Sequence, residues 1–593
     1  MGFLKVADPP FEVAQWKRLS HVRRIRPLVL RWVEYGTDSP GVVHLFYILK
    51  IAIYCWGAVA VAASTPGIGD VSDFATWWGE PIVYQKIVVF TMLFEALGLG
   101  GGTGPLFFKF LPPCTGFLHF FRPGTIRLPP WPTKVPFTSG DRRSVTDVVL
   151  YAGFVASAVR LLFSPGTGPV PPGATVGLLG ASALLPVVIL LALLGLRDKT
   201  IYLAARAEMY WVACLIFFFP YTDMMIGLKF ALVAIWWGAG VSKLTHIFPA
   251  VVMVMISNSP FRPKWFKRLM YRDADHDIRP SKAAAVLAHQ GTIIELGLPV
   301  VLLLGHGGIV SAAAVILMII FHLHIISTIP VGSPNEWNVF MIFGTSFLFW
   351  RHADIGVSDM QHPALIALVL LALLTPVIVG NLRPDLVSFL PAMRYYAGNW
   401  AVGLWCFRDG ADQQLKRHIT KASGLMTEQL TRLFDADTAE LTNFKFRAFR
   451  SMHPQGRALN GLLSRALDDV DRYTVHDGEP IGGTLVGWNF GDGHLHNEQL
   501  LAAVQKRCDY REGELVLIFL ESQPIHVQRQ RYRIVDAATG EIEAGYVHTR
   551  DMLTRQPWLE EDDVTFPVEV ISRGPAAPPK PRPEPEPAVA EQA

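Results

Sequence analysis

The chain has 593 residues, of which 51% are hydrophobic and 17% charged, a composition too apolar for an ordinary soluble protein of this length. A formal net charge of +3, with no stripe of lysine and arginine between aromatic residues, argues against nucleic acid as a partner. The five cysteines are scattered without CxxC spacing, so they offer no disulfide framework, which suits a reducing compartment.

The first forty residues mix basic and apolar side chains and lack the apolar run of a secretory signal. Lys17, Arg24 and Arg31 are among the bases, while Trp16 and Ile25 are among the apolar residues. This pattern predicts a basic amphipathic cytosolic segment over residues 1–40 that lies on the cytoplasmic leaflet. A solvated tail before the first helix is the alternative.

Residues 41–406 contain long apolar runs and form the predicted transmembrane domain. A bilayer core about 30 Å thick needs roughly 20 apolar residues in a helix. Candidate spans lie at 42–63, 85–108, 145–163, 174–196, 207–221, 224–243, 283–304, 309–329, 335–350 and 363–382. A further run at 388–406 either crosses the membrane or lies flat. The predicted fold class is an all-α polytopic membrane bundle of about ten transmembrane helices with a C-terminal α+β soluble domain.

The charges of the loops predict the orientation of the bundle. The 64–84 loop has no lysine or arginine, whereas the 109–144 and 244–282 loops are rich in both. Because basic loops remain in the cytoplasm, the N-terminus is predicted to be cytoplasmic, and ten spans return the C-terminus to the same side. The expected location is the inner or plasma membrane. If residues 388–406 cross the bilayer, the C-terminal domain moves outside.

The C-terminal part, residues 407–574, has an ordinary polar composition and predicts a cytosolic α+β domain. Met426, Leu430 and Leu433 follow helical spacing, and the same pattern recurs from Leu459 to Leu467. Strands are predicted at 515–520, 531–535 and 542–547, the last two joined by the hairpin turn DAATGE. The proline-rich tail, residues 575–593, is predicted to be disordered. A protein partner would be expected at the 407–574 domain.

Ionisable side chains inside apolar spans are costly, which makes them candidates for function. These residues are Lys50, Glu95, Arg160, Lys229, Lys243, His289, Glu295, His322 and His324. Glu95 precedes LGLGGGTG, which lacks the Lys-Ser/Thr of a phosphate loop and favours a helix break. Snorkelling or ion pairing is the alternative for the cations. The histidines could instead be hydrogen-bonded residues of the bundle interior.

The segment GWNFGDGHLHNEQ at 487–499 brings acids and histidines close together in the sequence. On a strand, Asp492, His494, His496 and Glu498 would share one face, as metal ligands do. A Gly-Asp-Gly turn followed by a helix from Asn497 is the interpretation we favour. We therefore predict no metal site.

Four segments follow one another between residues 197 and 344: RDKT at 197–200, GAGVSKL at 238–244, HQGTIIELGLP at 289–299 and FHLHIISTIPVG at 321–332. In this order and spacing they resemble the transmembrane domain of the vitamin K-dependent γ-carboxylase superfamily, also called the horizontally transferred transmembrane domain. The carboxylase-like core covers about 197–344. The whole chain also resembles an uncharacterised actinobacterial transmembrane family that has no assigned activity.

The carboxylase resemblance implies a catalytic lysine at Lys243, a desolvated base that acts toward a reduced naphthoquinone of the menaquinol or vitamin K type. His322 matches the family's F-H histidine, which would polarise or deprotonate a quinone oxygen. Glu295 would pair with either residue. Lys199, His289 and His324 complete the candidate site as cofactor-binding residues.

The sequence also departs from the carboxylase pattern. Ser242 precedes Lys243 where the family has two lysines, and LHIISTIPVG replaces the asparagine-glutamine stretch after the F-H motif. The large lumenal domain that captures protein substrates is missing, so protein carboxylation is not expected. We predict a quinol- or lipid-linked oxidoreductase or lyase that acts on a lipophilic small molecule among membrane lipids. The alternative is a non-catalytic membrane scaffold, or a lipid-handling or transport protein, with a cytosolic domain that docks a partner.

Overall fold

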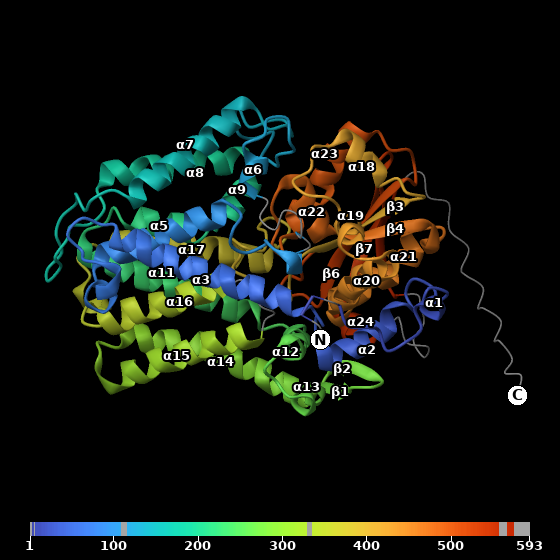
Figure 1. Cartoon of the computed structure of the whole chain (residues 1–593), viewed down its shortest axis with the longest axis horizontal. Coiled ribbons are helices and arrows are strands. Elements are labelled where there is room, and N and C mark those ends of the chain that lie inside the picture. The colour runs from blue at the N-terminus through green and yellow to red at the C-terminus, as the bar shows by residue number, and fades with distance from the viewer. Residues whose placement is uncertain are drawn as a thin grey trace, which may run out of the picture.

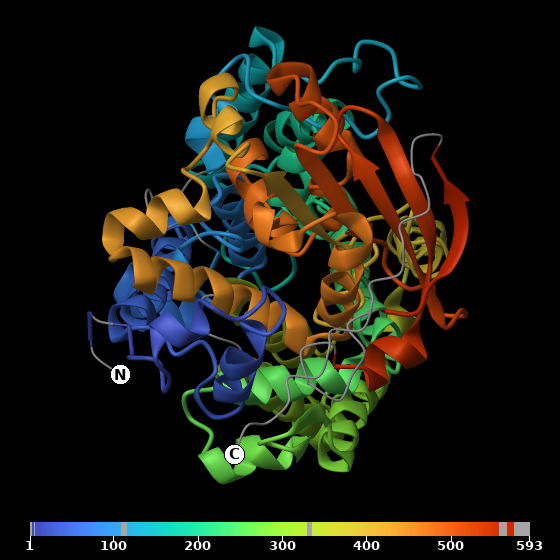
Figure 2. The same cartoon turned by 90° about the vertical axis from the view of Figure 1, so that its right-hand side faces the viewer.

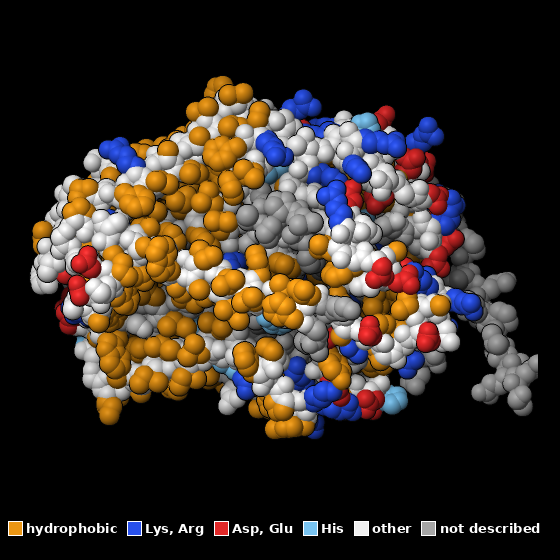
Figure 3. All heavy atoms as spheres, in the orientation of Figure 1, with side chains coloured by type: hydrophobic (Ala, Val, Ile, Leu, Met, Phe, Trp, Pro, Cys, Tyr) orange, Lys and Arg blue, Asp and Glu red, His pale blue; other side chains and the backbone are white. Residues whose placement is uncertain are grey.

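The computed structural model describes residues 3–4, 6–107, 109, 116–328, 335–556 and 566–574. Most helices of residues 41–382 lie side by side along the longest axis, and an α+β part covers one end of this bundle (Figure 1). Apolar side chains gather over the helical part, whereas most of the charged groups lie on the α+β part (Figure 3). The disordered tail that the sequence predicts at 575–593 lies outside the described residues.

Six helices in the described part of the chain are long and apolar enough to cross a membrane. They are α3 (Gly41–Ala63), α7 (Val145–Leu162), α11 (Tyr221–Ser242), α14 (Lys282–Leu304), α15 (Gly308–Thr328) and α17 (Pro363–Leu382). Helix α11 is central, because 78% of its apolar window is buried, compared with 28% for α3 and α14.

The prediction of about ten spans is not confirmed, because four of the predicted spans form shorter helices. These are α5 (Pro81–Ala96), α8 (Ala181–Arg197), α10 (Tyr210–Ile216) and α16 (Asn335–Ser346), the last continued by a π-helical turn over Phe347–Arg351. Helix α5 stops where Gly98 adopts a φ of 71°, a conformation that glycine accepts without strain. The chain bends again before α10, where Arg206 has a φ of 51°.

Local sequence signals account for several of the helix ends. Ser144 and Asp147 form a capping box at the start of α7, in which each side chain binds the backbone N–H of the other residue. The Ser281 side chain accepts from the backbone N–H of Ala284 and caps α14. Pro363 occupies the first turn of α17, where its missing N–H costs no hydrogen bond.

The N-terminal segment packs against protein, whereas its sequence suggested a lipid surface. It forms α1 (Val13–Trp16) and α2 (Ile25–Tyr35), and the apolar face of α2, including Ile25, Val29 and Trp32, is buried. This face shares one core with α12 (Phe248–Asn258) and α20 (Ala436–Met452). The Trp32 indole N–H donates to Asn258 Oδ1 at 2.7 Å. The N-terminal segment and the α+β part therefore lie at the same end of the bundle (Figure 2).

The apolar run at 388–406 does not form a helix. Residues 388–400 form turns, and Val402–Arg408 is strand β3, so the α+β part begins slightly before the predicted boundary at 407. The run is apolar because β3 lies inside a sheet, with all but its last residue buried.

The sheet has six antiparallel strands in the order β4-β3-β5-β6-β7-β8. The strands besides β3 are β4 (Tyr473–Asp477), β5 (Leu515–Leu520), β6 (Arg529–Asp536), β7 (Gly540–His548) and β8 (Glu569–Arg573). The three predicted strands correspond to β5, β6 and β7. Strand β5 is buried on both faces: Ile518 packs toward α21 (Pro454–Ala466), and Leu517 belongs to the core that includes α23 (Glu498–Cys508).

The remaining elements are short and connect these layers. In the α+β part they are α18 (Gln413–His418), α19 (Met426–Leu433), α22 (Gly478–Val486) and α24 (Thr549–Thr554). Between the longer helices lie α4 (Phe74–Trp77), α6 (Gly116–Phe120), α9 (Lys199–Ala204), α13 (Lys264–Leu269) and the hairpin β1 (Tyr271–Asp273) and β2 (Asp277–Pro280).

The glycine run after α5 joins the bundle to the α+β part, as expected for a helix break packed against a neighbour. The Trp488 indole N–H donates to the carbonyl of Gly101 at 2.8 Å. A Cβ on Gly102 would lie 2.4 Å from the backbone oxygen of Asn489, so only glycine permits this approach. Glu95 accepts a hydrogen bond from the Gly101 backbone N–H at 2.9 Å.

Candidate functional site

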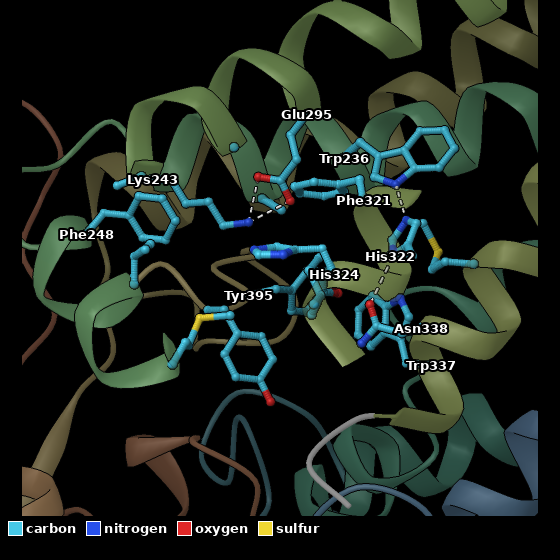
Figure 4. A pocket seen from close by; sticks show the side chains of 18 of the residues that line it. Trp236, Lys243, Phe248, Glu295, Phe321, His322, His324, Trp337, Asn338 and Tyr395 are labelled. Carbon is cyan, nitrogen blue, oxygen red and sulfur yellow. Dashed lines mark hydrogen bonds and ion pairs between the residues drawn. The ribbon is translucent and has the colours of Figure 1, made fainter. Parts of the chain in front are cut away.

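A cavity of about 110 Å³ lies beside the end of α11 that faces the α+β part. Helices α11, α12, α14, α15 and α16 supply its walls, and Phe389, Tyr395 and Phe490 close it from the side of the α+β part. Lys243, Glu295, His322 and His324 all line this cavity (Figure 4). The structure thus brings together all three residues predicted to be catalytic and one of those predicted to bind a cofactor.

Lys243 and Glu295 form a buried ion pair within the cavity wall. The Lys243 Nζ lies 2.6 Å from Glu295 Oε1 and 2.5 Å from Oε2, and the two residues are only 6% and 4% exposed. Lys243 directly follows α11, and its ammonium also lies 5.5 Å from the ring centroid of Phe248. A Cβ on Gly240 would lie 2.8 Å from Leu296, so this glycine allows α11 and α14 to approach closely enough for the pair to form.

His322 is held by hydrogen bonds at both ring nitrogens. The Trp236 indole N–H donates to Nε2 at 3.0 Å, and Nδ1 lies 2.9 Å from Asn338 Oδ1. Because an indole nitrogen can only donate, Nε2 must be the acceptor, and Nδ1 then carries the proton that it donates to Asn338. The imidazole is therefore neutral, with its tautomer fixed. In this state both ring nitrogens of His322 contact protein side chains.

His324 follows His322 by two residues on α15, and Figure 4 shows its ring beneath the Lys243–Glu295 pair. The Arg262 guanidinium lies 3.0 Å from its Nδ1. An arginine can only donate, so Nδ1 accepts and the proton resides on Nε2. His324 therefore carries a donor N–H on its other ring nitrogen.

The other two residues predicted to bind a cofactor lie away from this cavity. His289 is on α14 but faces outward and is exposed. Lys199 begins α9, and its Nζ donates to Gln499 Oε1 at 2.8 Å, which ties the bundle to α23. Both residues belong to the motifs that suggested the site. The rotation of α14 turns His289 away from the cavity, and the position of α9 places Lys199 outside it.

Two other ionisable groups that the sequence analysis named within the spans, Lys50 and Lys229, have structural partners. Lys50 forms an ion pair with Glu336 at 2.6 Å and donates to the Gly100 carbonyl at 2.8 Å. Lys229 donates to backbone carbonyls that include that of His352, at 2.8 Å. Arg160 is exposed in the last turn of α7.

The acids and histidines of 487–499 form a turn that leads into a helix, as favoured from the sequence. Asp492 accepts from the backbone N–H of His494 at 3.1 Å, and Asn497 caps α23. His494 lies 3.1 Å from Glu521 and not beside His496. Within the described ranges, no group of three or more histidine, cysteine, aspartate or glutamate residues could hold a metal ion.

Four residues that hold His322 or close the cavity were not predicted from the sequence: Trp236, Asn338, Tyr395 and Phe490. Trp236 is seven residues before Lys243, two helical turns away on the same side of α11, and this spacing could have identified it. Asn338 and Tyr395 gave no comparable signal, because each reaches the cavity from a separate element. Phe490 belongs to the α+β part and follows Lys243 by more than two hundred residues in the sequence.

These features define a multi-pass transmembrane protein whose helical bundle encloses a small cavity with a buried ion pair. The family described as transmembrane protein of unknown function (DUF3556) matches residues 1–571, and the chain belongs to this family. No significant match to the chain was found among curated proteins or among solved structures. The family match brings no assigned activity, and none of these comparisons supports the γ-carboxylase superfamily specifically.

Proposed function

We propose that this protein is a membrane enzyme that performs acid–base chemistry on a lipophilic quinol, with Lys243 and Glu295 as its reactive pair. The observation that carries the proposal is the opening of a buried ion pair onto an aromatic-walled cavity. Charged groups at membrane depth are costly, and they commonly mark sites of substrate or proton handling. The motif resemblance to a quinol-using family, which includes Lys243 and His322, supports the same class of substrate.

The walls of the cavity suit a flat, lipid-soluble ring. Trp236, Phe248, Phe321 and Tyr395 surround it, and Lys243 with Glu295 supplies a polar edge where a ring hydroxyl could bind (Figure 4). A volume of about 110 Å³ is of the order of cavities that hold one aromatic ring. The scarcity of polar wall groups disfavours a sugar or a nucleotide.

Glu295 and Lys243 have different roles in the proposed proton transfer. An ammonium in an ion pair has no lone pair, so the Glu295 carboxylate is the group that accepts the proton of a ring hydroxyl. Lys243 then stabilises the resulting oxyanion. The pair is neutral before the transfer and carries one positive charge after it, opposite one negative charge on the ring, so no net charge appears in the apolar cavity. The quinol supplies two electrons, which we assign to dioxygen, with quinone and hydrogen peroxide as the products.

This proposal is tested with the full chain purified into phosphatidylcholine nanodiscs. Oxygen uptake with 1,4-naphthoquinol is measured above the rate without protein. Glu295→Gln keeps the size of the side chain but removes the base, so the rate is expected to fall by roughly 10²–10⁴-fold. His289→Gln, an outward-facing change on the same helix, is the matched control and should retain the wild-type rate. Wild-type turnover in Glu295→Gln would overturn the proposal.

A further inference from the structure

A second and larger chamber, of about 580 Å³, lies between the membrane bundle and the α+β part. Helices α3, α12, α20 and α22 contribute to its walls, which are largely aromatic and aliphatic. Met255, Phe389, Tyr396 and Phe490 line both this chamber and the Lys243 cavity. The two spaces are therefore neighbours that share one apolar wall. The volume of the chamber falls within the range of about 300–1,000 Å³ that is typical of small-molecule sites.

Most of the charges that line this chamber are already neutralised. Arg450 pairs with Asp477 at 2.8 Å and also with Glu479. Glu479 further accepts from the backbone N–H of Gly491 at 2.9 Å. Lys445 lies 3.7 Å from Asp38. Each of these lining cations therefore faces a carboxylate and contributes little net charge to the chamber.

Lys109 is different, because no described carboxylate lies within ion-pair distance of this buried cation, and Glu479 acts on it only from farther away. It is 4% exposed, and the hydrogen bond of its Nζ goes to the Gly487 carbonyl at 3.3 Å. The three lining bases, Lys109, Lys445 and Arg450, outnumber the two lining acids, Asp38 and Glu479, and Lys109 accounts for the excess. A buried ammonium with one long hydrogen bond retains unused donor capacity.

Asn489 adds a second unused donor to the same wall. Its Oδ1 accepts from the Asp492 backbone N–H at 3.1 Å, which fixes the orientation of the amide. Its Nδ2 is buried and has no hydrogen-bond partner in the part of the chain that the structure describes. Buried donors of this kind are rare unless a ligand or water satisfies them. Asn489 and Lys109 both line the chamber.

Gly483 lies beside the Lys109 ammonium and the backbone of Asn489, while the Asn489 Nδ2 lies against the neighbouring Gly482. A Cβ built on this residue would be 3.1 Å from Lys109 Cε, 3.5 Å from Lys109 Nζ and 4.0 Å from the backbone nitrogen of Asn489. The missing side chain thus leaves space next to the ammonium, and Gly483 also lines the chamber. Lys109 and Gly483 thus form a small recess with a free donor at one side of an apolar space, and Asn489 lines the same chamber.

We propose that this chamber binds a single-chain anionic amphiphile, whose headgroup is held by Lys109 and Asn489 over Gly483 and whose aliphatic chain lies along the apolar walls. An anionic headgroup would place a negative charge next to the Lys109 ammonium and would give the Asn489 amide N–H an acceptor. The apolar walls, which include Phe46, Phe446 and Phe449, favour an aliphatic chain. This site is separate from the proposed quinol site and does not depend on turnover there.

The headgroup could be the carboxylate of a fatty acid or the phosphate of a lysophospholipid, which share this chemistry. Equilibrium binding of tritiated palmitate and of palmitoyl lysophosphatidate is measured with the full chain in phosphatidylcholine nanodiscs. Hexadecanol has the same chain length without the charge and serves as the neutral ligand. The tighter of the two anions identifies the source of the headgroup, and either one binding tenfold or more tightly than hexadecanol supports the proposal.

Substitutions locate the binding in the recess. Lys109→Met is expected to weaken binding of the anions roughly tenfold or more while leaving hexadecanol unchanged, and Lys109→Arg should retain most of the affinity. Gly483→Ala should weaken both anions by filling the recess. Lys416→Met, at an exposed lysine of α18, is the matched control and should bind like the wild type. Unfolding curves of each variant confirm the fold. Wild-type palmitate and lysophosphatidate binding by a folded Lys109→Met, or equal affinity for hexadecanol, would overturn the proposal.

Discussion

Substitution of Lys243 by methionine should destabilise the protein far more than a surface change of the same kind. The Lys243 and Glu295 side chains are 7% and 5% exposed, and their charged atoms lie 2.5 Å apart. Removing the lysine leaves a buried carboxylate without its partner, which typically costs about 3–5 kcal/mol. Replacing both members by apolar residues removes the stranded charge, so the double variant Lys243→Met/Glu295→Leu should recover most of this loss.

The free energy of unfolding is measured by titration with a denaturing detergent, for the wild type, both single variants and the double variant. Arg383 and Asp385 provide the control, because their ions lie 2.8 Å apart but their side chains are 62% and 44% exposed. Arg383→Met should therefore cost less than about 1 kcal/mol. The reasoning would be refuted if the losses of the two single variants at 243 and 295 simply added in the double variant, because additivity means that the two charges do not interact.

Three further outcomes are expected. His322→Leu leaves the Trp236 indole N–H without its acceptor and should cost about 1–3 kcal/mol of unfolding free energy, whereas His322→Gln, which retains an acceptor, should cost less. Burial lowers the pKa of Lys109 to about 7, so palmitate binding should be strongest below this pH and should weaken as the pH rises and the ammonium loses its proton. His453, which also lines the chamber, stays neutral over this range because burial lowers its pKa to about 3. Palmitate binding that does not depend on pH would contradict the assignment to Lys109. A cysteine introduced at Thr539, an exposed position just after Asp536, should resist an impermeant thiol reagent in intact cells, since the charges of the loops predict a cytoplasmic C-terminal domain, and labelling would reverse that orientation.

The strands of the α+β part were predictable because short apolar runs flanked by turns have few alternatives. LVLIFL at 515–520 coincides with β5, and the DAATGE turn lies between β6 and β7. The run at 388–406 was ambiguous for a related reason. A strand buried on both faces is as apolar as a membrane helix, and β3 is such a strand. Only its pairing with β4 and β5 separates the two interpretations.

The prediction of about ten spans is not confirmed, because hydropathy counts apolar residues but does not detect where a helix stops. The window at 85–108 includes Gly98 and the glycines that follow it, so α5 ends at Ala96. The window at 174–196 contains a loop up to Gly180, and α8 begins only after it. Buried helices of this kind need not match the thickness of the bilayer, because neighbouring helices cover them.

Part of the site could be predicted because charged residues within apolar helices are rare. Lys243, Glu295 and His322 were all identified in this way, and the structure brings them to one cavity. The sequence left open whether Glu295 pairs with Lys243 or with His322, because the choice depends on how the helices are rotated and packed, and the structure pairs it with Lys243. His289 shares α14 with Glu295, and only the packing of that helix shows that one faces outward while the other faces the cavity.

Photolabelling tests whether the Lys243 cavity binds a quinol ring. The full chain in nanodiscs is irradiated with an azido-substituted naphthoquinone, and the labelled peptides are identified by mass spectrometry. We expect labels on the cavity-lining parts of α11, α14 and α15, near residues such as Trp236, Gly291 and Phe321, and their loss when excess unlabelled naphthoquinol is present. Labels confined to exposed apolar residues outside the cavity, such as Ile53 and Val149, and unaffected by the competitor would show that the cavity does not bind the ring.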